Sequence, residues 1–190
     1  VNSTFSINVS AKQFSNINLP DNFKETLEKY DIHPSAVIIE ITESATIKEP
    51  ELAKAILRKF RSFGFGISVD DFGTGYSSIS YLRQFPVTEI KFDKSFTKNI
   101  NIDEQDEIII SGLSSIAQQL HLNIVMEGVE TEKQIYWIEK NIPNAIIQGY
   151  FFSKPLKIEN FISFARNNQP VKAKTNKELK ENHKNQMESV

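Results

Sequence analysis

The chain has 190 residues, of which 39% are hydrophobic and 24% are charged, as in one ordinary globular domain. Its formal net charge of −2 argues against a DNA-binding surface, because such surfaces are basic. It contains no cysteine, which excludes disulfides and thiolate metal sites and fits a reducing compartment. No apolar run approaches the roughly 20 residues of a membrane span. We therefore expect a cytoplasmic protein with no DNA partner.

Apolar strand-like runs alternate along the chain with segments of helical periodicity. The expected strands cover residues 5–9, 37–41, 66–69, 89–93, 123–127 and 145–148. The expected helices cover residues 22–30, 50–63, 77–84, 103–120, 131–140 and 156–165. Such regular βα alternation predicts a parallel sheet.

Two of these helices carry more specific signals. Thr131, with Gln134 three positions later, predicts a capping box at the start of the helix over 131–140. In the helix over 103–120, apolar residues at helical spacing predict one buried face. That predicted face consists of Ile109, Leu113, Ile116, Ala117 and Leu120.

A parallel sheet of this kind closes either as a doubly wound open sheet or as a (β/α)₈ barrel. No Gly-x-Gly-x-x-Gly follows the first strand, so a dinucleotide-binding fold is unsupported. Six strands are two short of a barrel, and we expect the other two to lie upstream of residue 1. Residues 1–166 are expected to form the domain. Residues 167–190 are rich in Lys, Asn and Glu and are expected to be a disordered tail.

Polar side chains lie within or at the end of every expected strand, where burial without partners would be costly. These residues are Asn8, Glu40, Asp70, Asp71, Lys91, Glu127 and Gln148. Parallel strands would bring them to one end of the sheet. We expect the oxygens of the carboxylates and of Asn8 to face a common centre, with the Lys91 nitrogen at its edge. Carboxylate and amide oxygens suit Mg²⁺ or Mn²⁺, and such a site favours metal-assisted hydrolysis of a phosphate ester.

Lys91 has other interpretations. It could pair with Glu89 or Asp93 at the surface, or form a Schiff base in an aldolase-like barrel. An aldolase would not need five oxygen ligands, so the hydrolase is preferred.

In order and approximate spacing, six motifs resemble those of the EAL domain, a family of bacterial phosphodiesterases that hydrolyse cyclic di-GMP. The motifs are Asn8-Val9-Ser10, Glu40-Ile41-Thr42-Glu43, Asp70-Asp71-Phe72-Gly73-Thr74-Gly75, Lys91-Phe92-Asp93, Glu127-Gly128-Val129-Glu130 and Gln148-Gly149-Tyr150-Phe151-Phe152. The resemblance covers roughly residues 1–165. It implies a TIM-like barrel, of which about six of eight strands are present here, and cyclic di-GMP as the substrate.

The resemblance also implies a site with two ions, Mg²⁺ or Mn²⁺. By motif position, Asn8, Glu40 and Asp70 would bind the first ion. Asp70 would bridge to the second ion, which Asp71 and Glu127 would also bind.

The remaining motif residues would serve the reaction without binding metal. Lys91 would position or activate the attacking water, and Gln148 would assist, so that Lys91, Glu127 and Gln148 form the catalytic group. Glu43 resembles the residue that braces the loop over residues 70–78.

The sequence departs from the family in one respect, because it contains no Glu-Ala-Leu motif. Every later motif is intact, so truncation explains this better than decay. We expect the parent protein to release linear pGpG and the 190-residue chain alone to be inactive. An upstream sensory or GGDEF-type domain and a homodimer through EAL domains are the other expected partners. The alternative function is a non-catalytic cyclic di-GMP sensor, and an upstream Glu-Ala-Leu would favour the enzyme.

Overall fold

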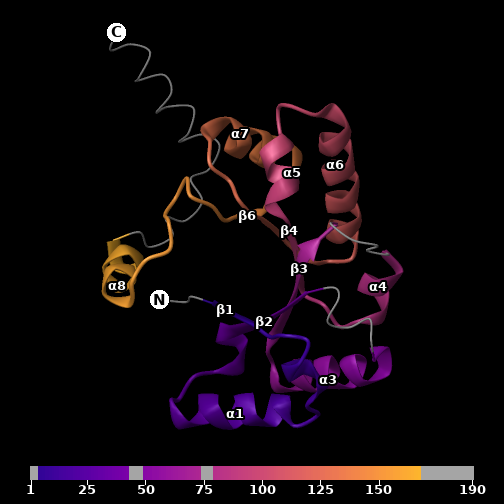
Figure 1. Cartoon of the computed structure of the whole chain (residues 1–190), viewed down its shortest axis with the longest axis vertical. Helices are drawn as coiled ribbons and strands as arrows, with labels where there is room; N and C mark the ends of the chain where they lie inside the picture. The colour runs from indigo at the N-terminus through magenta and orange to yellow at the C-terminus, as the bar shows by residue number, and fades with distance from the viewer. Residues whose placement is uncertain (1–3, 43–48, 74–78, 168–190) are drawn as a thin grey trace. The chain divides into compact units, whose positions relative to one another are not determined.

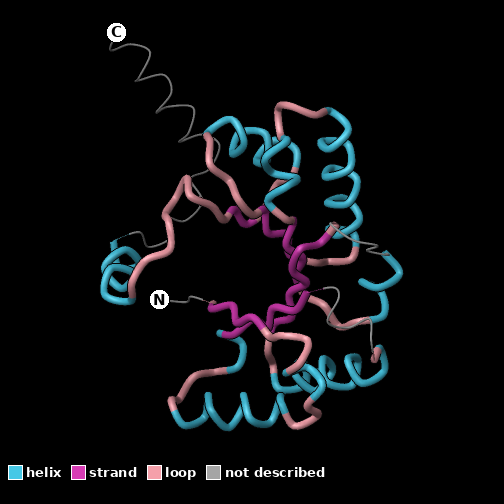
Figure 2. The backbone as a smooth tube through the Cα atoms, viewed as in Figure 1, coloured by secondary structure: helices cyan, strands magenta, loops and turns pink. Residues whose placement is uncertain are grey.

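Six parallel strands form one sheet in the computed structural model, which describes residues 4–42, 49–73 and 79–167. The strands are β1 (Phe5–Asn8), β2 (Val37–Thr42), β3 (Gly66–Phe72), β4 (Glu89–Phe92), β5 (Asn123–Met126) and β6 (Ile146–Ile147). Each strand pairs in parallel with the next strand along the chain, in the order β1 to β6. This order confirms the barrel, because a doubly wound sheet reverses direction at a switch point. The strands curve into the half-barrel visible in Figure 2.

Helices connect successive strands and lie outside the curved sheet (Figure 1). They are α1 (Leu19–Lys29), α3 (Pro50–Phe63), α4 (Ile79–Gln84), α5 (Lys94–Asn99), α6 (Glu104–Gln119) and α7 (Glu132–Asn141), with short 3₁₀ helices at Gln13–Ser15 and Pro34–Ala36. A second compact unit contains α8 (Ile158–Asn167). The expected tail is therefore helical at its first residue, and residues 168–190 lie outside the described part.

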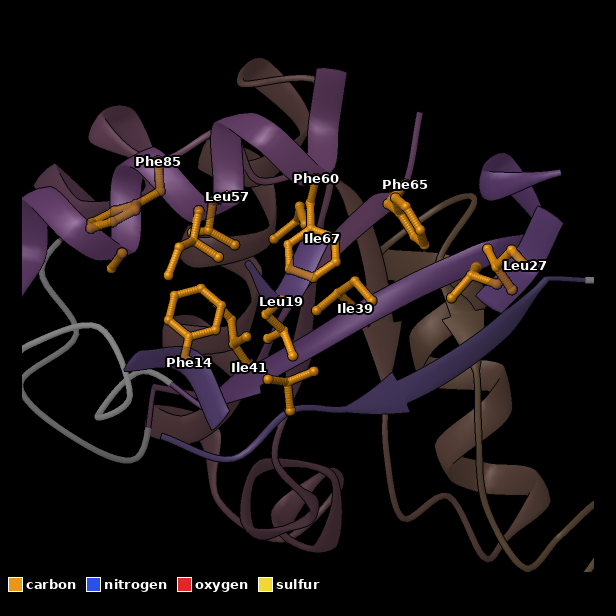
Figure 3. Packing of buried hydrophobic residues seen from close by; sticks show 14 residues of the cluster. Phe14, Leu19, Leu27, Ile39, Ile41, Leu57, Phe60, Phe65, Ile67 and Phe85 are labelled. Atoms are coloured by element: carbon orange, nitrogen blue, oxygen red, sulfur yellow. The ribbon is translucent and has the colours of Figure 1, made fainter. Parts of the chain in front are cut away.

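The first apolar core lies between strands β2 and β3 and helices α1 and α3 (Figure 3). Ile39 and Ile41 alternate with Glu40 along β2, so their side chains point to the helix side of the sheet. There they meet Phe60, whose ring makes edge-to-face contact with Phe65 at 5.2 Å between centroids. Gly64 ends α3 with φ of 99°, the left-handed conformation typical of a helix C-terminus.

A second apolar core packs β3–β6 against α5, α6 and α7. The predicted inner face of α6 is wrong in part, since Ile109 is 47% exposed and Leu120 is 41% exposed. Ile110 is fully buried instead, one position further along the helix. Three consecutive isoleucines, residues 108–110, lie in this helix, so helical periodicity alone fits more than one face.

The capping box of α7 is confirmed, with Thr131 and Gln134 satisfying each other's backbone N–H groups. Helix α5 was not predicted; it begins after Asp93, which accepts a hydrogen bond from Ser95 N. Within the described ranges, we find no helix with the length and apolar character needed to cross a membrane.

Candidate active site

The concave side of the half-barrel is polar where its outer side is apolar. Strands β2, β3 and β4 alternate between apolar side chains that face the helices and polar side chains on the opposite face. The fully or nearly buried polar residues on that opposite face are Glu40, Ser68, Glu89 and Lys91. Four polar groups buried side by side must be satisfied by one another or by a ligand.

Lys91 is the centre of this polar group. Its Nζ lies 2.6 Å from Glu127 Oε1, 3.1 Å from Glu40 Oε1 and 3.3 Å from Asp70 Oδ1. The four residues come from four neighbouring strands, β2 to β5, or the residue just after them. The predicted convergence of Glu40, Asp70 and Glu127 is therefore confirmed. The predicted place of Lys91 at the edge is wrong, because its ammonium lies among the carboxylates.

The carboxylates keep Lys91 protonated. Burial alone would lower the pKa of Lys91, but the hydrogen bond to Glu127 and the charges of Glu40, Glu127 and Asp70 outweigh it and raise the pKa. In this arrangement Lys91 is a hydrogen-bond donor and a positive charge, and not a proton acceptor. The burial of Lys91 and its three contacts exclude a surface ion pair with Glu89 or Asp93 as its main environment.

Glu127 differs from Lys91 in that its pKa shift favours the uncharged form. Burial raises the pKa of the Glu127 carboxyl, and the charges of Asp70 and Glu40 raise it further, while Lys91 opposes them. A carboxyl with a raised pKa beside a lysine can exchange a proton more readily than an exposed one.

Asp70 and Asp71 lie where β3 departs from regular pairing with β4. The register shifts between Val69 and Phe72, so the two aspartates occupy an irregularity of the kind that redirects side chains. Asp71 has φ of 54°, a left-handed conformation that aspartate tolerates better than most residues. Its backbone N–H donates to Asp70 Oδ1 at 3.1 Å. Burial first, and then the charges of Asp70 and Asp93, raise the pKa of Asp71.

Three predicted site residues of the described part, Asn8, Asp71 and Gln148, do not belong to the contact group around Lys91. Asn8 is the register partner of Glu40 at the end of β1, and its side chain is exposed. Gln148 is also exposed, and its backbone bridges two segments, because its N–H donates to Met126 O and its carbonyl accepts from Val129 N. Glu43 lies outside the described residues, so its bracing role is untested.

Glu89 is the buried acidic residue that the sequence interpretation placed at the surface. It is 3% exposed and lies two residues before Lys91, so both side chains point to the concave face of β4. Burial and the nearby charge of Glu40 raise the pKa of Glu89, against the opposing effects of Ser68 and Lys91. The spacing of Glu89 and Lys91 in the strand was the signal that could have identified it.

The donor set suits a divalent cation. Three carboxylates already converge on one positive charge, and oxygen-only ligands match Mg²⁺ or Mn²⁺ better than zinc. The ammonium of Lys91 takes the central position in this structure. Consistent with that, no group of three or more acidic or histidine side chains in the described part is itself arranged around a metal position.

Comparison with known proteins gives a consistent result. The family model for the EAL domain matches residues 2–155. The chain is 36% identical over 157 residues to the bifunctional diguanylate cyclase/cyclic di-GMP phosphodiesterase MucR of Pseudomonas aeruginosa, covering 83% of this chain and 23% of that protein. The chain thus spans less than a quarter of the length of this relative.

Solved structures that share the fold include two complexes with cyclic di-GMP. One is the PaMucR phosphodiesterase in complex with c-di-GMP, with a TM-score of 0.77, 35% identity and coverage of 83% of this chain and 64% of that chain. The other is the manganese and cyclic di-GMP complex of BlrP1 from Klebsiella pneumoniae, with a TM-score of 0.75, 27% identity and coverage of 80% and 39%. With a family match over residues 2–155 and a half-barrel that superposes on these structures, the chain belongs to the EAL domain family.

Proposed function

We propose that this chain is the catalytic part of a metal-dependent phosphodiesterase that hydrolyses cyclic di-GMP to linear pGpG. The observation that carries the proposal is the convergence of Glu40, Asp70 and Glu127 on one cationic group at the C-terminal ends of neighbouring parallel strands. Relatives that are named cyclic di-GMP phosphodiesterases support the substrate.

Two Mg²⁺ or Mn²⁺ ions are the proposed cofactors. Asn8, Glu40 and Asp70 would hold one ion, and Asp70, Asp71 and Glu127 would hold the other. When bound, such ions polarise a phosphoryl oxygen and make water a better nucleophile at neutral pH. The manganese and calcium complexes of BlrP1 support a divalent cation at this kind of site.

The chain's own residues would then orient the reacting groups. Lys91 is a protonated donor at the centre of the site, so we assign it to holding the attacking water or a phosphoryl oxygen by a hydrogen bond. Glu127 is assigned a share in proton transfer because its pKa is raised. Gln148 is assigned a supporting contact, and Glu43 the bracing of the loop after β3.

We place this domain, residues 1–166, in the cytoplasm and within a longer protein. The bifunctional cyclase relative supports a GGDEF-type partner domain, and the oxygen sensor relative DosP of Escherichia coli supports a sensory one. Pairing of two EAL domains as a homodimer completes the proposed partners. The second candidate function is a cyclic di-GMP sensor without turnover, although a sensor would not require Lys91 paired with three carboxylates.

Product analysis distinguishes the enzyme from the sensor. The test protein is this chain extended upstream by about 60–70 residues, enough for two βα units at typical lengths. We expect linear pGpG from cyclic di-GMP with Mg²⁺ or Mn²⁺, inhibition by Ca²⁺ and no product in excess chelator. Asp70→Asn should lower the rate by at least about 100-fold. Nucleotide binding without product would support the sensor, and equal turnover in chelator would refute metal dependence.

A further inference from the structure

Gln134 has a buried side chain whose amide oxygen and nitrogen both make hydrogen bonds. It is 9% exposed. Its Oε1 accepts from Glu130 N and Thr131 N, both at 2.9 Å. Its Nε2 donates to Thr97 O at 3.0 Å. The first two bonds belong to the helix cap of α7, but the third crosses to a carbonyl in the last turn of α5 and has no role in capping α7.

These three bonds join the two segments that follow the central catalytic pair. Glu130 and Thr131 lie in the loop after β5, three and four residues beyond Glu127. Thr97 lies in α5, which begins at Lys94, three residues beyond Lys91. One amide side chain therefore connects the segment after Lys91 with the segment after Glu127.

The two segments are packed closely, so the hydrogen bonds of Gln134 leave them little room to move relative to each other. Glu127 N donates to Phe92 O at 3.2 Å. A Cβ at Gly128 would lie 2.5 Å from Lys94 Cβ, so only glycine allows this approach. A second link runs nearby, where Asn101 Nδ2 donates to Lys133 O at 3.3 Å.

We propose that Gln134 is a positioning residue that sets the contact between Lys91 and Glu127. It does so by fixing α5 against the loop after β5. That contact, 2.6 Å between Lys91 Nζ and Glu127 Oε1, is the shortest of the three around Lys91. Its catalytic meaning rests on the proposed phosphodiesterase function, whereas the mechanical link can be measured without substrate.

Gln134→Glu separates the two roles of this side chain. The carboxylate keeps an acceptor for Glu130 N and Thr131 N, as in an ordinary capping box. It loses the donor to Thr97 O and places a negative charge against a carbonyl. Asp103→Ala is the matched control, because it removes a helix cap on α6, where Asp103 accepts from Gln105 N. In the described structure the Asp103 side chain makes no hydrogen bond to the two segments after Lys91 and Glu127; only its backbone N–H does, donating to Asn99 O at the end of α5, and the substitution keeps that bond.

The primary measurement is the rate at which Lys91 is acetylated by an amine-reactive reagent, followed by mass spectrometry. Lys91 is shielded and paired in the native chain, and the exposed lysines serve as internal standards. We expect faster labelling of Lys91 in Gln134→Glu, with hydrogen-exchange protection of Glu130 and Thr131 retained. Asp103→Ala should label Lys91 at the native rate. Native labelling of Lys91 in Gln134→Glu would overturn the proposal and leave Gln134 as a helix cap only.

Manganese affinity supplies a second readout. If the pair sets the geometry of the carboxylates, Gln134→Glu should weaken Mn²⁺ binding by about 10-fold, as is typical of residues that orient metal ligands. Asp103→Ala should bind Mn²⁺ as the native chain does. A native chain that binds no Mn²⁺ would contradict the proposed function, while the labelling result would still decide the role of Gln134.

Discussion

Lys91 is paired with three carboxylates, so its removal should leave three negative charges that repel one another in a buried site. We expect Lys91→Met to lower the free energy of unfolding by about 3 kcal/mol near neutral pH. The loss should shrink as the pH falls towards about 5, because protonation relieves the repulsion. Urea denaturation at several pH values measures both effects.

The matched control is Lys59→Met, which breaks the partly exposed ion pair with Asp21. Such pairs contribute about 0–1 kcal/mol, so this variant should be nearly as stable as the native chain. Equal losses for the two lysines would show that Lys91 is a surface charge.

Substitution of Glu89 should increase stability, whereas substitution of Lys91 should decrease it. The pKa of Glu89 is raised in the folded chain, so the folded state binds more protons than the unfolded state above the ordinary value of 4.5. The free energy of unfolding should therefore fall as the pH rises from 4.5 through the folded-state pKa. Glu89→Gln should remove that fall and stabilise the chain near pH 7 by about 1 kcal/mol. The exposed Glu25→Gln is the control, and a Glu89→Gln chain less stable than native at pH 7 would indicate a paired carboxylate.

The buried face of α6 can be tested by substituting two neighbouring isoleucines. Ile110→Ala removes a fully buried side chain and should cost about 2–4 kcal/mol. Ile109→Ala, at a neighbouring position that is 47% exposed, should cost less than about 0.5 kcal/mol. Chemical denaturation of the two variants decides it. The reverse order would restore the face predicted from the sequence.

Elements with a strong local signal were predictable from the sequence. Pro50 and Gly64 bracket α3 as expected, and the Thr131–Gln134 box begins α7. Strand β2 was found because Val and Ile flank a single charged residue. Helix α5 was missed because only Phe96 is apolar in its six residues, so it has no helical periodicity to detect.

The candidate site was predictable in membership and less so in geometry. Glu40, Asp70 and Glu127 could be grouped because parallel strands bring their ends together. The central place of Lys91 depends on side-chain reach across three neighbouring strands, which spacing along the chain does not encode. The burial of Glu89 depends likewise on which face of β4 lines the barrel.

Strands β1 and β6 are the outer strands, or edge strands, of the described sheet. Phe5 is 52% exposed, Ile7 38% and Ile146 50%, so both outer strands present apolar side chains. Outer strands of this kind pair with other chains unless they are charged or covered. We expect light scattering to show self-association of the 190-residue chain, reduced by Ile7→Lys and unchanged by Ile108→Lys on α6. A monodisperse native monomer would show that these outer strands do not pair with other chains.

Glu40, Asp70 and Glu127 are proposed to form a site for a divalent cation. Calorimetric titration of Mn²⁺ into the native chain and into the triple variant Glu40→Gln, Asp70→Asn, Glu127→Gln tests this proposal directly, with circular dichroism confirming that both are folded. We predict saturable Mn²⁺ binding by the native chain and its loss in the triple variant, because neutral amides are poor substitutes for carboxylates as ligands of hard cations. Equal Mn²⁺ uptake by both proteins, or none by the native chain, would contradict the proposal.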